Sequence, residues 1–237
     1  MEEKRNFDLL TLGQVLLRLS PPNNDRLVRG DTFVKQVGGA ELNVAVGVAL
    51  LGLRTGVISK LPSHDMGSFM KGKIRSYGVS DDFFMYDDSP SARVGIYYYE
   101  NGAYPRKPKV IYDRANSSFY SLKIDEIPEK AYTASRCFHT SGITLALSPK
   151  VRETTIEMIK RFKAAGTLVS FDVNFRGNLW TGEEAKECIE QILPYVDIFF
   201  CSEDTARLTF KKTGTAREMM KSFTEEYPIS IVASTQR

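Results

Sequence analysis

The chain has 237 residues, of which 42% are hydrophobic, and its 32 basic and 29 acidic residues give a formal net charge of +3. A chain of this length and composition can bury a substantial core, and single α/β domains of this size are common. The charges are spread along the sequence without the long basic blocks of a nucleic-acid-binding tail, so no nucleic-acid partner is expected.

No apolar run is long enough to span a bilayer, and the charged first five residues are not followed by the apolar stretch of a signal peptide. We therefore expect a cytoplasmic protein with no membrane partner. Cys137, Cys188 and Cys201 are odd in number and widely spaced, which favours buried thiols over disulfides or zinc ligands. His64 and His139 have no Glu or Cys at ligand spacing, so no metal site is predicted.

Strand-like and helical patterns alternate along most of the chain. In order, the patterns predict a strand at 7–19, a helix at 40–53, a strand at 55–60, a helix at 66–77, a strand at 136–141, a helix at 150–165, a strand at 167–175, a helix at 183–193, a strand at 198–201, a helix at 216–226 and a strand at 229–233. This order builds a mostly parallel sheet covered by helices. The predicted fold class is α/β.

Two stretches interrupt the alternation. Residues 18–37 contain a Pro-Pro-Asn-Asn turn, and residues 92–115 contain Asn101-Gly102 between strand-like runs. Both are predicted to be antiparallel insertions. Segments outside a βα core commonly form a lid over a ligand site, so a small antiparallel β lid is expected here.

Residues 37–45 read Val-Gly-Gly-Ala-Glu-Leu-Asn-Val-Ala and lead from a strand into a helix. Gly38 and Gly39 permit close backbone approach to a polyol, because neither carries a Cβ. Free amide groups at a helix N-terminus also receive oxygen atoms favourably. Asn43 lies in the first turns and can both donate to and accept from hydroxyl groups. A tight turn that caps the helix is the alternative explanation of this spacing.

The strand at 167–175 is unusual because one of its faces is polar. That face carries Ser170, Asp172, Asn174 and Arg176, whereas a parallel strand covered by helices is normally apolar on both faces. Open α/β sheets bind ligands at the carboxyl ends of their strands, where Asn174 and Arg176 are expected. An edge strand that exposes one face would explain the same pattern.

The second insertion places aromatic and cationic side chains on shared faces. Alternate residues of a strand point the same way, so Tyr112 and Arg114 share one face, and Tyr97 and Tyr99 share another. Two lid strands can therefore present these groups to one pocket. The alternative is that the tyrosines are ordinary strand residues and Arg114 is a solvated charge.

Several short motifs follow one another in a recognisable order. They are Gly38-Gly39, Asn43, Ala45, Leu51-Gly52, Lys-Leu-Pro at 60–62, Asp65, Gly67 and Gly78-Val79. This series resembles the N-terminal signature of the ribokinase family of carbohydrate kinases. Residues 17–22, 109–114 and 172–176, with Leu179-Trp180, are similar to its 2-keto-3-deoxygluconate kinase branch.

The resemblance extends from Thr11 to the last residue and implies a ribokinase-like fold, ATP and Mg²⁺ as cofactors, a sugar acid as the small-molecule substrate, and a homodimer formed through the lid. The substrate contacts of the branch would fall on Gly38, Asn43, Tyr97, Tyr112, Arg114 and Arg176. A pair of arginines suits a sugar acid, because a guanidinium group holds a carboxylate through a planar fork of donors. A hydrogen bond to a charged group contributes roughly 1.5–3 kcal/mol, which favours 2-keto-3-deoxygluconate over a neutral sugar such as fructose.

The motif that would carry phosphoryl transfer does not occur in the sequence. In the family that the chain resembles, the catalytic base lies in a Gly-Ala-Gly-Asp type motif, so we assign no catalytic residue here. We expect residues 1–237 to form an incomplete ribokinase-like domain that lacks the C-terminal nucleotide-binding part and is inactive alone. Ser202 and Glu203 occupy the place of an Asn-x-x-Glu pattern and are candidates for cofactor binding, although helix capping explains them equally well.

The sequence contains neither a Walker-type phosphate loop nor a Gly-x-Gly-x-x-Gly motif after a strand, which disfavours P-loop enzymes and nicotinamide dehydrogenases. Three functions stay open: a kinase for a sugar acid, a truncated non-catalytic module that binds a sugar acid, and a kinase for a neutral sugar such as fructose.

Overall fold

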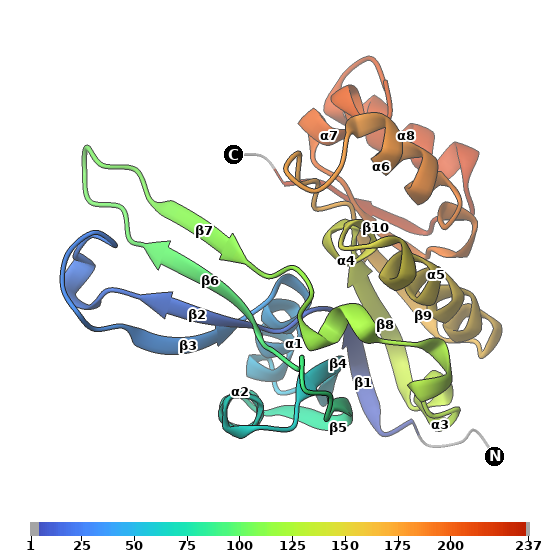
Figure 1. Cartoon of the computed structure of the whole chain (residues 1–237). Helices are drawn as coiled ribbons and strands as arrows, with labels where there is room; N and C mark the ends of the chain where they lie inside the picture. Colours follow the sequence, from blue (N-terminus) through green and yellow to red (C-terminus); the bar gives the residue numbers. More distant parts are fainter. Residues whose placement is uncertain (1–4, 236–237) are drawn as a thin grey trace.

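The computed structural model describes residues 5–235, which form two β-sheets and the helices that cover them (Figure 1). The larger sheet has seven strands, all paired in parallel, in the order β11-β10-β9-β8-β1-β4-β5. These strands are β1 (Phe7–Leu12), β4 (Thr55–Pro62), β5 (Val79–Asp87), β8 (Ser135–Ser141), β9 (Leu168–Asp172), β10 (Ile198–Phe200) and β11 (Ile231–Ala233). The predicted α/β class is confirmed.

Helices connect these strands, and most of those within residues 5–235 begin at a residue whose side chain caps the helix. They are α1 (Ala40–Leu50), α2 (Asp65–Ser76), α3 (Lys130–Thr133), α4 (Gly142–Ala146), α5 (Pro149–Ala164), α6 (Gly182–Glu190), α7 (Glu203–Leu208) and α8 (Ala216–Glu226). Thr181 and Thr215 each accept a hydrogen bond from the third helical residue, a glutamate whose side chain accepts in return from the backbone of the cap. Because these signals are local, the five longer helices lie close to where they were predicted.

The two insertions form one four-stranded sheet, called the lid here, which projects to the left in Figure 1. Its strands are β2 (Leu16–Ser20), β3 (Val34–Gly38), β6 (Gly95–Glu100) and β7 (Lys109–Asp113), in the order β3-β2-β6-β7. β2–β3 and β6–β7 pair antiparallel as predicted, whereas β2 and β6 pair in parallel and join the two insertions.

One prediction about a strand was wrong, and one strand was not predicted. The single strand expected at 7–19 breaks between Leu12 and Leu16, so that β1 stays in the core sheet and β2 enters the lid. β5 was not predicted, because its first half is polar and it pairs with β4 alone at the edge of the sheet. Asp81 in this polar half forms ion pairs with Lys71 and Arg75 of α2.

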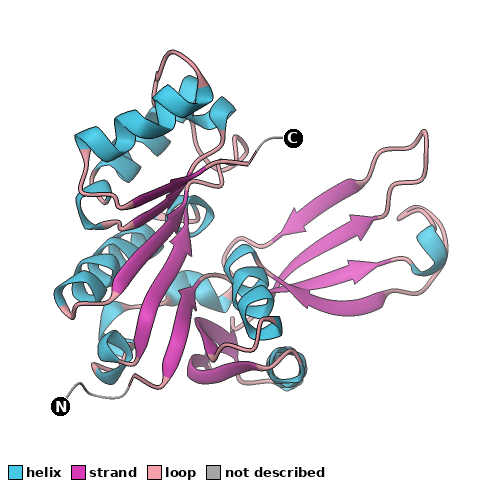
Figure 2. Cartoon of the chain, turned by 180° about the vertical axis from the view of Figure 1, so that it is seen from behind, coloured by secondary structure: helices cyan, strands magenta, loops and turns pink. Residues whose placement is uncertain are grey.

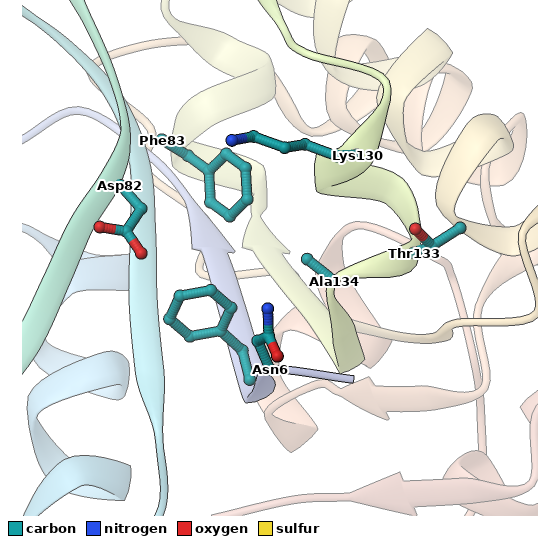
Figure 3. Close-up of a pocket in the computed structure, with 7 residues that line it drawn as sticks. Asn6, Asp82, Phe83, Lys130, Thr133 and Ala134 are labelled. Atoms are coloured by element: carbon teal, nitrogen blue, oxygen red, sulfur yellow. The ribbon is translucent and has the colours of Figure 1, made fainter. Parts of the chain in front are cut away.

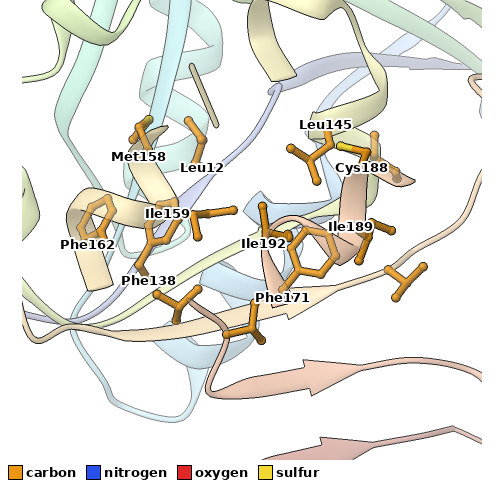
Figure 4. Close-up of a cluster of buried hydrophobic side chains, with 14 of the residues drawn as sticks. Leu12, Phe138, Leu145, Met158, Ile159, Phe162, Phe171, Cys188, Ile189 and Ile192 are labelled. Atoms are coloured by element: carbon orange, nitrogen blue, oxygen red, sulfur yellow. The ribbon is translucent and has the colours of Figure 1, made fainter. Parts of the chain in front are cut away.

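The core consists of two clusters on opposite faces of the larger sheet. The cluster in Figure 4 packs the sheet against α4, α5 and α6, with the rings of Phe138 and Phe162 stacked at 4.0 Å between centroids. The second cluster packs α1 and α2 against the other face, near β4 and β5, and includes Leu42, Met70 and Ile74. Burial of such side chains is the main force that holds the layers together.

Half of this second face has no helix over it among the residues that the structure describes, and Figure 2 looks onto it. Leu168, Phe200 and Ile231 point to this face and are 50%, 38% and 54% exposed. The other faces of β9 and β10 carry Phe171 and Phe199, which are fully buried. Since β9 lies between β8 and β10, the edge-strand explanation of its polar face is wrong.

None of the helices within residues 5–235 is long and apolar enough to cross a membrane.

Candidate functional site

A cavity of about 390 Å³ lies where the lid meets the carboxyl edge of the larger sheet and the start of α1. Six residues that were predicted from the sequence line it: Gly39, Asn43, Tyr97, Tyr112, Arg114 and Arg176. They come from separate parts of the chain, and the fold brings them together at the sheet edge where α/β proteins bind ligands. The predicted clustering is therefore present, while ligand binding by these residues stays a prediction.

The paired glycines shape the wall of the cavity that α1 provides. Gly39 caps α1 without a side-chain hydrogen bond and has φ +155°, where a Cβ would lie 2.7 Å from the carbonyl oxygen of Gln14. Gly38 is not among the residues that line the cavity, and a Cβ there would lie 2.7 Å from Tyr97 Oη. Gly39 therefore requires glycine, because its φ is positive and a Cβ would meet backbone, whereas a larger residue at Gly38 would displace the hydroxyl group of Tyr97.

One face of the lid supplies aromatic and cationic groups. Tyr97 of β6 is the register partner of Tyr112 of β7, and their ring centroids lie 6.0 Å apart. Burial raises the pKa of Tyr97, so its hydroxyl group stays a neutral donor. Arg18 of β2 also lines the cavity and stacks over the ring of Tyr99 at 4.2 Å. Arg18 was not predicted as a site residue, although its alternation with Leu16 along β2 places it on this face.

Arg114 is held in the cavity wall by contacts with Gln14 and Tyr112. Its Nε donates to Gln14 Oε1 at 2.7 Å, and its guanidinium carbon lies 5.6 Å from the centre of the Tyr112 ring. Burial lowers the pKa of Arg114, and the nearby Arg176 acts in the same direction. An arginine stays protonated regardless, so the cavity contains positive charge that an anionic ligand would relieve.

Arg176 and Asn174 both follow β9, but only Arg176 lines the cavity. Arg176 is exposed and lines the cavity, and its Nη1 donates to the carbonyl oxygen of Phe175. Asn174 is not among the residues that line the cavity. It adopts φ +37°, and its backbone N–H donates to Asp172 Oδ1 at 3.0 Å, which is a turn geometry that asparagine tolerates.

Glu41 is a buried carboxyl group in the cavity wall that the sequence analysis did not select. Its Oε1 accepts hydrogen bonds from Ser141 Oγ at 2.5 Å and from Thr144 Oγ1 at 2.8 Å. Burial raises its pKa, and the two hydroxyl donors oppose that effect. Gly13 makes room for it, because a Cβ at Gly13 would lie 2.2 Å from Glu41 Oε2. Its partners lie 100 residues away in the sequence, so no local pattern indicates this contact.

Ser202 and Glu203, the predicted cofactor residues, lie at the start of α7 and do not line this cavity. Ser202 Oγ caps the helix by accepting from the backbone N–H of Thr205, and Glu203 pairs with Arg207 one turn later. Both groups are already engaged, and no group of three candidate metal ligands exists within residues 5–235. Helix capping accounts for these contacts, and binding of a cofactor by the two residues stays a prediction.

A second hollow of about 300 Å³, shown in Figure 3, lies at the opposite edge of the sheet near the amino ends of β1 and β8. It is lined by Phe7, Phe83 and side chains of α3, with Asp82 and Lys130 as its charged groups. None of the predicted site residues contributes to it, so it has no part in the site described above.

The sequence of this chain is similar to those of known carbohydrate kinases. The family model described as pfkB family carbohydrate kinase matches residues 6–235. A 2-dehydro-3-deoxygalactonokinase of Haloferax volcanii is 34% identical over 229 residues, which cover 97% of this chain and 71% of that protein. A 2-dehydro-3-deoxygluconokinase of Bacillus subtilis is 30% identical over 197 residues, which cover 82% of this chain and 60% of that protein.

Solved structures agree with these matches. The crystal structure of 2-dehydro-3-deoxygluconokinase from Thermotoga maritima has a TM-score of 0.90 and 32% identity, over 96% of this chain and 72% of that one. An uncharacterized sugar kinase from Pyrococcus horikoshii, solved in complex with ATP, has a TM-score of 0.75 and 25% identity, over 86% of this chain and 66% of that one. The chain therefore belongs to the pfkB, or ribokinase, family of carbohydrate kinases and is related to the kinases of 2-keto-3-deoxy sugar acids.

Proposed function

We propose that the cavity binds a 2-keto-3-deoxy sugar acid, with 2-keto-3-deoxygluconate (2-dehydro-3-deoxygluconate) as the first candidate, for ATP-dependent phosphorylation. The relatives in Haloferax volcanii, Bacillus subtilis and Thermotoga maritima are named as kinases of the galactonate or gluconate form. Both 2-keto-3-deoxygluconate and 2-keto-3-deoxygalactonate are therefore proposed as ligands, and both should bind more tightly than neutral sugars.

The observation that carries the proposal is the convergence of three arginines on one cavity. Arg18, Arg114 and Arg176 line it, and the carboxyl group of Glu41 is turned toward Ser141 and Thr144. A carboxylate ligand would supply the missing negative charge and accept forked hydrogen bonds from the guanidinium groups. A neutral sugar would leave the arginines without an anionic partner, which argues against the fructose alternative.

The remaining lining suits the hydroxyl groups of the same ligand. Asn43 can donate and accept, and the hydroxyl groups of Tyr97 and Tyr112 can do the same. The start of α1 at Gly39 adds backbone N–H groups that have no helical partner. We propose that these groups bind the polyol chain while the arginines bind its acidic end.

Phosphoryl transfer needs a carboxylate that positions and deprotonates the acceptor hydroxyl. The Gly-Ala-Gly-Asp motif is not in this sequence, and Glu41 is buried in hydrogen bonds with a raised pKa. We propose that these residues provide sugar recognition and the lid, and that transfer requires a base that this sequence does not supply. ATP would then be the phosphoryl donor of the complete reaction, and the lid would join two copies as a homodimer.

The test is a calorimetric titration of the chain with 2-keto-3-deoxygluconate, 2-keto-3-deoxygalactonate and fructose. The acids should bind more tightly than fructose, and Arg176→Ala should weaken acid binding about tenfold, which corresponds to ~1.4 kcal/mol. Arg136→Ala is the matched control, because Arg136 is exposed at the amino end of β8 and pairs with Asp8.

Equal affinity for fructose and the acids, or equal losses for the two arginine variants, would contradict the proposal. The same preparation incubated with ATP, Mg²⁺ and the sugar acid should give no phosphorylated product, and steady turnover would show that a catalytic base is present after all.

A further inference from the structure

Gln14 lies between β1 and β2 and is 3% exposed. All of its side-chain hydrogen bonds within residues 5–235 are made with the segment that follows β7, about 100 residues later in the sequence. Its Nε2 donates to the carbonyl oxygen of Arg114 at 3.1 Å and to Ser117 Oγ at 2.6 Å. Its Oε1 accepts from Arg114 Nε at 2.7 Å. One amide therefore holds both the backbone and the guanidinium group of Arg114.

The fold makes room for this amide. A Cβ at Gly95 would lie 2.8 Å from Gln14 Nε2 and 2.7 Å from Leu16 Cδ2, so a larger residue at the first position of β6 would displace the ends of these two side chains. Gln14 is consequently enclosed between the start of the lid and the carboxyl edge of the core sheet. A buried amide with three hydrogen bonds has little freedom to move.

The contact with Gln14 also decides which edge of Arg114 is free. A guanidinium group has one N–H on Nε and four on the two Nη atoms. Within residues 5–235, no oxygen accepts a hydrogen bond from either Nη atom of Arg114. The occupied Nε is turned toward Gln14, and the side chain lines the cavity, so the two Nη groups form its unused edge there.

We propose that Gln14 is a positioning residue that fixes Nε of Arg114, so that Arg114 presents its two Nη groups end-on to the carboxylate of a bound sugar acid. This inference rests on the proposed function and adds the geometry of acid recognition to it. An arginine that is already held loses less rotamer freedom when the ligand binds, and a forked contact distinguishes a carboxylate from a hydroxyl group.

The test compares the affinities of Gln14→Met for 2-keto-3-deoxygluconate and for fructose by calorimetry. Methionine keeps the length of the side chain and removes both the acceptor and the donors. The expected result is about tenfold weaker binding of the acid, or ~1.4 kcal/mol, with fructose binding unchanged. Gln14→Asn, whose amide is too short to reach Nε, should give the same change and serves if the methionine variant does not fold.

Ser117→Ala is the matched control, because it removes a hydrogen bond of Gln14 and leaves the contact with Arg114 Nε intact. It should keep the preference for the acid. In an Arg114→Lys background, which has no Nε–H for Gln14, the Gln14→Met change should have no further effect on acid binding.

A Gln14→Met variant that keeps its preference for the acid would overturn the inference. An equal loss in the Arg114→Lys background, or an equal loss for fructose, would do so too, because Gln14 would then act only by joining the lid to the core. If the wild-type chain shows no preference for the acid, the proposed function itself has failed.

Discussion

At the scale of single residues, the cavity wall contains buried polar groups whose partners come from distant parts of the chain. Glu41 illustrates the cost of such a group, since burial disfavours its charged form while Ser141 and Thr144 donate to it. Its pKa lies above the ordinary value of 4.5 in the folded protein. The folded state therefore binds the proton of the Glu41 carboxyl group more tightly than the unfolded state does, and this difference affects stability above pH 4.5.

This difference predicts how stability depends on pH. As the pH rises from 4.5 through the raised pKa of Glu41, the free energy of unfolding should fall, because the unfolded state releases the proton first. Glu41→Gln should remove this part of the fall, so the variant gains stability relative to the wild type as the pH rises. Urea unfolding at a series of pH values measures both slopes.

Glu153→Gln, which also replaces a glutamate but on the exposed side of α5, is the matched control. Parallel slopes for the wild type and Glu41→Gln would mean that the carboxyl group of Glu41 ionises in the folded state as easily as in the unfolded state.

Apart from Arg18, the residues that the sequence predicted and those that it missed differ in one physical respect. Gly39, Asn43 and Arg176 are identified by local signals: a strand-to-helix turn, a helix start and a polar strand end. Gln14 and Glu41 are recognisable only by contacts 100 residues away, which no periodicity encodes.

At the scale of elements, α1 contributes residues to the cavity and also contains a glycine that lowers the stability of the helix. It begins at Gly39, whose φ of +155° and contact with Gln14 leave no space for a Cβ. Gly47 lies in the interior of the same helix, and a Cβ there would contact nothing within 4 Å. The two glycines therefore have opposite roles, the first required by the turn and the second a source of backbone entropy in the unfolded chain.

Substitution by alanine should consequently have opposite effects at the two positions. Gly39→Ala should lower the free energy of unfolding by about 1–3 kcal/mol because of backbone strain. Gly47→Ala should raise it by roughly 0.5–1 kcal/mol. Denaturant unfolding of the two variants beside the wild type checks both, and a stabilising Gly39→Ala would contradict the geometry of the turn.

Element boundaries were predictable wherever a capping residue or a regular period marks them, as in α5 and α8. The break between β1 and β2 was not, because residues 7–19 keep an apolar character across two different sheets. The parallel pairing of β2 with β6 escaped prediction for a similar reason, since it joins two insertions that are about 80 residues apart.

At the scale of the whole molecule, association depends on apolar surface that stays exposed, and two such surfaces are considered among residues 5–235. One is the half face of the larger sheet with Leu168, Phe200 and Ile231, and the other is on the lid, where Phe33 and Ile111 are 46% and 45% exposed. A parallel sheet is normally covered on both faces, and contiguous exposed apolar surface promotes association. We expect the lid surface to support the proposed dimer and the sheet surface to cause further association at high concentration.

Sedimentation velocity over a range of concentrations separates the two surfaces. The wild type should form dimers at low concentration and larger species as the concentration rises. A Leu168→Ser and Ile231→Ser double variant should stay dimeric, because it removes apolar area from the sheet face only. A Phe33→Ser and Ile111→Ser double variant should lose the dimer and still associate at high concentration through the sheet surface. Phe33 directly precedes β3 and Ile111 lies in β7, the two outer strands of the lid, so these serines leave the core sheet intact. A monomeric wild type at all concentrations would exclude both interfaces.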